Sequence, residues 1–132
     1  MEKLQPSPDF NPYYQPNSPY SLSGRGITKL EESHFAYYRN EEIVDLSGNS
    51  LRFIPGWIAN YPIKKLIVNN NQSPFDLTFH ESIGKKKDLK VEVLGNGFYH
   101  PPKGLREDQV ICEIDFTSSD YHDQFTQISE QF

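Results

Sequence analysis

The feature that most constrains this chain is a pattern repeated five times along it. Each copy has an apolar residue, any residue and a second apolar residue, followed three positions later by an anchor position. The anchors fall at positions 25, 49, 71, 96 and 117, so that successive anchors lie 24, 22, 25 and 21 residues apart. Self-similarity at a period of roughly 20–50 residues is typical of proteins in which one structural unit stacks on the next. The sequence therefore predicts a stack of similar units.

The two apolar positions of each copy predict a short strand with one buried face, because side chains along a strand alternate between its two faces. The return of the chain after 21 to 25 residues would lay each strand beside the previous one. We expect these pairs to form the core of a sheet: Tyr20 and Leu22, Val44 and Leu46, Leu66 and Val68, Val91 and Val93, and Cys112 and Ile114.

The similarity continues beyond the anchor, most clearly in the run Asn49-Ser-Leu51-Arg-Phe-Ile54-Pro55-Gly-Trp-Ile58. This run resembles the unit of the leucine-rich repeat family, LxxLxLxxNxLxxLPxxL, which spans roughly 20–29 residues. The resemblance covers residues 20–117. It implies an α/β, β-rich leucine-rich repeat solenoid, with about five short parallel strands on a concave face and loops and short helical turns on the convex side.

The same resemblance gives the anchor asparagines a structural role. It implies that Asn49, Asn71 and Asn96 turn inward and form a ladder of hydrogen bonds to the backbone of neighbouring turns. The physical need is clear, because the buried backbone groups of a sharp turn require partners.

Several positions depart from the family pattern. Arg25 and Thr117 replace asparagine in the terminal units. The third unit has about three extra residues before Leu89, and we expect Leu77, Phe79 and Ile83 to supply its core. The family unit begins with an apolar position, and only Ile63 fills it with an apolar residue. In the five copies this position falls at Asn17, Glu41, Ile63, Asp88 and Gln109.

Both ends of the chain differ from the repeats. Residues 1–19 hold five of the ten prolines, which predicts a disordered or extended arm. In residues 118–132, the apolar stripe of Tyr121, Phe125, Ile128 and Phe132 predicts a helix that caps the last strand. An exposed recognition or export segment is the alternative for this helix, and an uncovered end of the stack would favour weak self-association of an otherwise monomeric chain.

Composition excludes several classes of protein. No apolar run approaches the ~20 residues of a membrane span, and residues 1–20 have no apolar core of a secretory signal. The single cysteine, Cys112, excludes an intramolecular disulfide and suits a reducing compartment, namely the cytoplasm or the host cytoplasm for a translocated bacterial effector. The formal charge of −5 argues against a dedicated nucleic-acid binder.

No catalytic or cofactor motif accompanies the repeats. The four histidines lack metal-binding spacings, and no glycine-rich phosphate loop is present. We therefore expect neither a metal, a cofactor nor an enzyme activity, and we expect Cys112 to serve as a core residue rather than as a nucleophile.

The residues between the core positions of each strand would form the opposite, concave face. Aliphatic residues on that face have no structural need to be there, and they alternate with charges, as a protein partner's binding surface does. We predict a non-catalytic protein-interaction surface, as in an adaptor or effector, made of Ile43, Asp45, Lys65, Ile67, Asn69, Lys90, Glu92, Leu94, Ile111, Glu113 and Asp115.

Two alternatives to a protein-interaction surface stay open at the level of sequence. The first is a solvated sheet that carries scattered apolar residues and binds nothing. The second is a surface for nucleic acid or phosphoinositide, formed by a basic cluster of Lys64, Lys65, Lys85, Lys86, Lys87 and Lys90.

Overall fold

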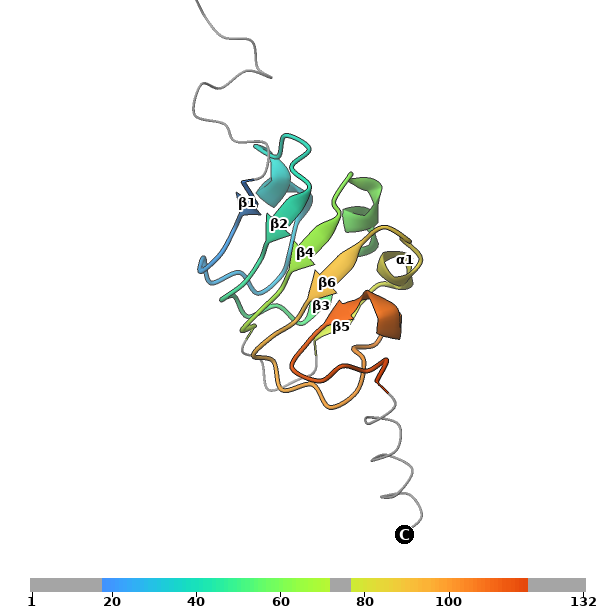
Figure 1. The fold of residues 1–132 in the computed structure, drawn as a ribbon. Coiled ribbons are helices and arrows are strands. Elements are labelled where there is room, and N and C mark those ends of the chain that lie inside the picture. The colour runs from blue at the N-terminus through green and yellow to red at the C-terminus, as the bar shows by residue number, and fades with distance from the viewer. Residues whose placement is uncertain (1–17, 72–76, 119–132) are drawn as a thin grey trace, which may run out of the picture.

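The computed structural model describes residues 18–71 and 77–118, which form a parallel sheet with short helices behind it (Figure 1). The sheet has five strands in the order β1-β2-β4-β6-β7. Their bounds are Tyr20–Ser21 (β1), Ile43–Asp45 (β2), Lys65–Ile67 (β4), Lys90–Glu92 (β6) and Val110–Ile111 (β7). A second parallel sheet pairs β3 (Phe53–Ile54) with β5 (Thr78–Phe79) and lies behind the first (Figure 1). The α/β content expected from the sequence is confirmed at this level.

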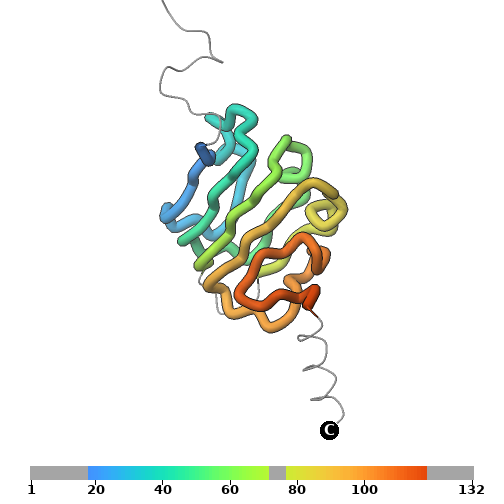
Figure 2. Tube along the Cα trace, in the orientation of Figure 1, coloured from blue at the N-terminus to red at the C-terminus, as the bar shows by residue number. Residues whose placement is uncertain are grey.

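Each connection between neighbouring strands of the large sheet contains a short helix among its described residues. The helices are η1 (Glu32–Phe35), η2 (Gly56–Asn60), α1 (Glu81–Gly84) and η3 (Glu107–Gln109). The trace in Figure 2 advances across the sheet one strand at a time, so strands that follow one another around a connection also lie side by side. Every paired strand of this sheet is parallel to its neighbours.

The apolar positions predicted for the central strands form the core. Val44, Leu46, Leu66, Val68, Val91 and Val93 are all fully buried. The core residues expected from the irregular third unit are confirmed, since Leu77, Phe79 and Ile83 are also buried. Burial of this apolar surface, rather than any intrinsic preference of such short strands, stabilises the sheet.

The last strand lies two residues earlier than the sequence pattern predicts. The pattern places Cys112 opposite Val91, but the partner of Val91 is Val110, and Ile111 pairs with Glu92. The reason is the position of η3, which ends at the buried Gln109, so that β7 begins at the very next residue, Val110. Because strand side chains alternate with a period of two, a shift by two residues keeps every side chain on its predicted face.

The shift has consequences for two predictions. Cys112, expected in the core, lies beyond β7 and is only half-buried, and its thiol donates to Glu113 Oε1 at 3.3 Å. The position equivalent to Asn96 is Asp115 and not Thr117, so the predicted last anchor is wrong. Asp115 acts within its own turn, because its Oδ1 accepts from the backbone amide of Thr117 at 3.0 Å.

The predicted arm over 1–19 and the predicted C-terminal helix over 118–132 fall almost entirely outside the described residues. Within the described ranges, no helix has the length and apolar character needed to cross a membrane.

Candidate protein-interaction surface

The asparagine side chains at the anchors fix the turns at one end of the sheet. Asn49 is buried, and its Oδ1 accepts from the backbone amides of Arg25 and Ile27, both at 3.0 Å. Its Nδ2 donates to the carbonyls of Leu22 at 3.1 Å and Leu46 at 2.9 Å. One amide side chain thus satisfies backbone groups in its own turn and in the preceding one.

The two following asparagines repeat this arrangement. Asn71 Oδ1 accepts from the amide of Leu51 at 3.0 Å, and its Nδ2 donates to the carbonyl of Leu46 at 3.2 Å. Asn96 Oδ1 accepts from the amide of Asn71 at 2.8 Å, and its Nδ2 donates to the carbonyl of Val68 at 2.9 Å. These are the backbone hydrogen bonds that the resemblance implies for a ladder, and each of them links a turn to the preceding one.

On the other side of the strands, side chains form an outward face arranged in three rows across the sheet. The strand register places Ile43, Lys65 and Lys90 in the first row, and Asp45, Ile67, Glu92 and Ile111 in the second. Backbone hydrogen bonds from Gly48 to Asn69 and from Asn70 to Leu94 continue the pairing, so Ser47, Asn69 and Leu94 form the third. The candidate residues of three neighbouring strands and of β7 are thereby brought together.

The aliphatic residues of this face form an apolar diagonal that turns back by one row at its last member. Ile43 on β2 stands one row before Ile67 on β4, which stands one row before Leu94, and Ile111 on β7 returns to the second row. Neighbouring members are separated by one strand and two residues, or about 8 Å between Cα atoms. The first three are half-buried and Ile111 is 37% exposed, so all four present part of their apolar surface.

Polar side chains on both sides of the diagonal are held in place by hydrogen bonds. Glu92 lies 3.4 Å from Lys65 Nζ and accepts from Asn69 Nδ2 at 2.7 Å. Asn69 Oδ1 in turn accepts from the amide of Leu94 at 2.7 Å. The Oγ of Ser47 accepts from the amide of Asn69 at 3.1 Å. Side chains that are already ordered lose less conformational entropy when a partner binds.

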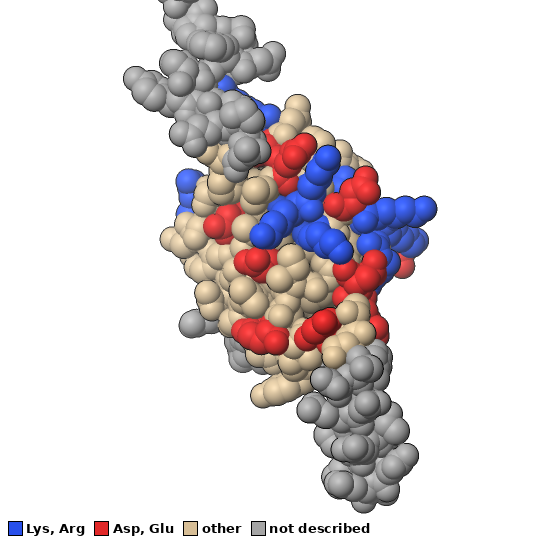
Figure 3. Space-filling view, viewed as in Figure 1, with Lys and Arg blue, Asp and Glu red and all other residues tan. Residues whose placement is uncertain are grey.

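The final turn gives the face an acidic end. Glu113 Oε2 accepts from the amide of Gly95 at 2.7 Å, and this hydrogen bond lowers the pKa of the Glu113 carboxyl. The pKa of Asp115 is also lowered, because the hydroxyl and the amide of Thr117 both donate to it. Figure 3 shows lysine and arginine side chains toward the upper right of this face and acidic side chains along its lower edge.

The lysines of the predicted basic cluster lie beside acidic or carbonyl partners. Lys64 is 3.7 Å from Glu42, Lys85 is 3.6 Å from Glu81, and Lys90 Nζ donates to the carbonyl of Asp108 at 2.8 Å. The structure also places Lys65 beside Glu92, and Lys86 Nζ against the carbonyls of Ala59 and Tyr61. Lys87 is exposed. The positive charge of this region is therefore mixed with negative charge rather than concentrated.

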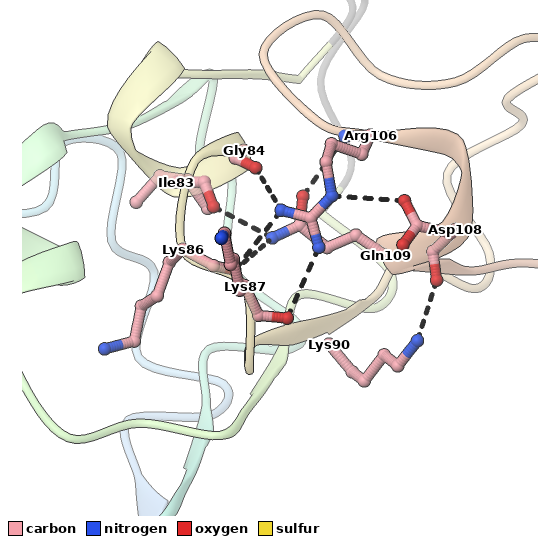
Figure 4. Close-up of polar contacts among 8 residues, drawn as sticks. All are labelled: Ile83, Gly84, Lys86, Lys87, Lys90, Arg106, Asp108 and Gln109. Atoms are coloured by element: carbon pink, nitrogen blue, oxygen red, sulfur yellow. Dashed lines mark hydrogen bonds and ion pairs between the residues drawn. The ribbon is translucent and has the colours of Figure 1, made fainter.

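A polar clamp under α1 was not predicted from the sequence (Figure 4). The guanidinium of Arg106 donates to the carbonyls of Gly84, Lys86 and Lys87, and its Nε donates to Asp108 at 3.1 Å. These bonds bring donors to the carbonyl of Gly84, the last residue of α1, and to two carbonyls of the turn that follows the helix. The clamp positions the connection before β7.

Gln109 completes this clamp from a fully buried position. Its Nε2 donates to the carbonyl of Ile83 at 2.8 Å, and its Oε1 accepts from the amide of Arg106 at 3.1 Å. In the observed register Gln109 is level with Lys90 and not at the leucine position of the unit, so the repeat pattern gave no signal for its role. Glu41 does stand where the unit pattern expects leucine; it is buried, and its Oε1 accepts from the amide of Arg39 at 2.6 Å.

Within residues 18–71 and 77–118, no group of three or more His, Cys, Asp or Glu side chains is placed to hold a metal ion. The Cys112 thiol has its pKa raised by burial, which disfavours the thiolate form. Comparison of the chain with protein-family models, with curated proteins and with solved structures finds no match in any of the three.

Proposed function

We propose that this chain is a leucine-rich repeat protein that binds a protein partner through the outward face of its five-stranded sheet, without catalysis. In this proposal the face is the concave side of a short solenoid. The strand order, the step of 21 to 25 residues and the backbone hydrogen bonds of Asn49, Asn71 and Asn96 support the assignment.

The observation that carries the proposal is the apolar diagonal of Ile43, Ile67, Leu94 and Ile111 on a face that is otherwise polar. These aliphatic side chains are not needed for the core, which the opposite face of the same strands supplies. Partner surfaces combine apolar contact with a polar rim, and the ordered side chains of Lys65, Asn69 and Glu92 would form part of such a rim.

An intracellular adaptor, or an effector that acts in a host cytoplasm, is the role we propose for such a surface. The lone cysteine agrees with a reducing compartment. The alternative of binding nucleic acid or phosphoinositide is less well supported, because the lysines it needs stand next to carboxylates and carbonyls.

An affinity pulldown from cell lysate tests the proposal by comparing the wild type with the double variant Ile67→Glu, Leu94→Glu. We expect the double variant to fold, as judged by circular dichroism, and to lose the partner. The matched control is Tyr37→Glu, Tyr99→Glu, which makes the same chemical change at two exposed aromatic residues outside the rows of the outward face.

Capture that is equal in all three proteins would contradict the proposal. Release of the partner at moderate salt, with no effect of the Ile67→Glu, Leu94→Glu change, would instead favour recognition of an acidic polymer or lipid by the lysines, since such binding falls steeply with salt.

A further inference from the structure

At the corner of the outward face formed by β6 and β7, apolar and acidic side chains alternate. The register of these strands places Glu92 beside Ile111 in the second row. Glu113 follows Ile111 by two residues and accepts from the amide of Gly95, so it stands beside Leu94 in the third row. The two aliphatic side chains therefore lie on one diagonal of this β6–β7 corner, and the two carboxylates lie on the other.

The two carboxylates of the corner differ in their partners. Glu92 is paired with a cation of the chain itself, because it lies 3.4 Å from Lys65 Nζ. In the described part of the chain, Glu113 accepts from the amide of Gly95 at 2.7 Å and from the thiol of Cys112 at 3.3 Å, and it contacts no lysine or arginine. These neutral donors lower the pKa of the Glu113 carboxyl and fix its position, but they do not compensate its charge.

The spacing of the corner suits one long side chain that is apolar along its stem and positive at its tip. Neighbouring strands lie about 4.8 Å apart, and alternate residues of one strand lie about 7 Å apart. Leu94 is half-buried, whereas Ile111 and Glu113 are exposed, so a partner can reach all three side chains. The stem of a basic side chain would pack on the two aliphatic residues while its charged end reaches the carboxylate.

Arginine matches this corner better than lysine does. Its planar guanidinium is more weakly hydrated than an ammonium group, so it loses less when it is placed against aliphatic surface. It also presents parallel N–H groups to a carboxylate, and such charge-assisted hydrogen bonds are about twice as strong as neutral ones.

We propose that the β6–β7 corner binds an arginine side chain of the protein partner, with its stem on Leu94 and Ile111 and its guanidinium on Glu113. This inference rests on the proposed function and deepens it, because it states which side chain the partner presents to one end of the apolar diagonal. The carboxylate is already fixed by hydrogen bonds, so binding needs little further ordering of this side chain.

The test follows the backbone amide signal of Gly95 in NMR spectra of the full chain, because this amide donates directly to Glu113. The probe is N-acetylargininamide, and its neutral match is N-acetylcitrullinamide, which has a side chain of the same length. We expect a saturable shift of the Gly95 signal with the arginine probe. The citrulline probe should bind about tenfold more weakly, since only the cation gains a charge-assisted hydrogen bond. N-acetyllysinamide should also bind more weakly than the arginine probe.

Two variants remove the charge and the apolar support separately. Glu113→Gln keeps an oxygen that can accept from Gly95, so the reporting amide stays in place, and it should weaken binding of the arginine probe about tenfold. Leu94→Ser should weaken it about fourfold, the equivalent of one buried methylene group. The matched control is Glu32→Gln, the same chemical change at an exposed residue of η1, for which we expect unchanged affinity. A urea titration checks that each variant is folded.

Three results would overturn the inference. The first is the absence of a saturable shift of the Gly95 signal with the arginine probe. The second is equally tight binding of the citrulline or the lysine probe. The third is an effect of Glu32→Gln as large as that of Glu113→Gln, which would indicate general attraction to an acidic chain.

The pulldown described above separates failure of this inference from failure of the proposed function. A partner that is lost from the Ile67→Glu, Leu94→Glu variant but fully captured by Glu113→Gln would overturn the arginine site and leave the proposed function in place. Equal capture by all of these proteins, together with a saturable shift of the Gly95 signal, would contradict the proposed function and support the corner as a site for arginine.

Discussion

The backbone amide of Leu51 donates a hydrogen bond to the side chain of Asn71 at 3.0 Å, although the two residues stand 20 positions apart. The same side chain donates to the carbonyl of Leu46, which directly follows β2, the strand that precedes that turn. A single asparagine therefore connects its own turn to both sides of the turn before it. Because these groups are buried, each such side chain replaces water at several backbone positions at once.

Replacing Asn49 by alanine should lower the free energy of unfolding by about 3 kcal/mol, because the change leaves several backbone groups without partners. The amide of Ile27 and the carbonyl of Leu22 are among these groups, and both bonds are buried. Urea denaturation followed by circular dichroism measures the loss. The control is Asn60→Ala at an exposed position, for which we expect a change within about 0.5 kcal/mol. Equal effects at the two positions would contradict a ladder role for Asn49.

Two glycines with left-handed backbones should respond differently to alanine. Gly97 has φ +76° and open space where a Cβ would lie, so Gly97→Ala should cost about 1 kcal/mol of backbone strain alone. Gly104 has φ +100°, and a Cβ there would overlap the carbonyl of Phe79 on β5. Gly104→Ala should therefore cost about 3 kcal/mol or more. Thermal and urea unfolding of both variants measure the difference, and similar losses would show that β5 can move away from residue 104.

The acidic end of the outward face predicts a pH dependence of stability. The amide of Gly95 lowers the pKa of Glu113, so the ionised carboxylate is favoured in the folded state. Its contribution is present above the ordinary pKa of glutamate and is lost as the pH falls through the lowered value.

Glu113→Gln should therefore be less stable than the wild type at pH 7, and the two proteins should converge as the pH falls through the lowered pKa of Glu113. Urea midpoints measured at several pH values give this comparison. Because the carboxyl is exposed, we expect a small effect that added salt reduces. A difference that grows on acidification would refute the assigned hydrogen bond.

Gln109→Leu should lower the free energy of unfolding by about 2 kcal/mol, since an apolar side chain of similar volume fills the space but leaves the Arg106 amide without its acceptor and removes the side-chain donor to the Ile83 carbonyl. Arg106→Lys tests the other side chain of the clamp, because the ammonium group of lysine cannot bond all three carbonyls that the guanidinium reaches. We expect both variants to increase hydrogen exchange at Gly84 and Lys85. A stable Gln109→Leu protein with unchanged exchange would show that the clamp is dispensable.

The apolar alternation was sufficient to predict the central strands and both of their faces. It identified Val44, Leu66 and Val91 as core residues and placed Ile67 on the other side of the sheet. It failed at the last strand, where a shift of two residues leaves the alternation unchanged and so gives no signal in the sequence.

The polar clamp could not be predicted from the apolar alternation, for a different physical reason. Arg106 and Gln109 are polar side chains that bond carbonyls 22 and 26 positions away, and no periodicity marks such a contact.

The hydrogen bonds of Asn49, Asn71 and Asn96 also bear on how the protein reaches its native state. Within the described part of the chain, none of these bonds spans more than 28 residues, the separation between Asn96 and Val68. Parallel strands usually impose contacts between distant segments, and the entropy of closing long loops slows their assembly. Here each of these asparagines finds its partners in its own turn or in a turn next to it. During synthesis on the ribosome, the sheet can therefore grow strand by strand as the chain emerges, because none of these hydrogen bonds needs a segment that is made much later.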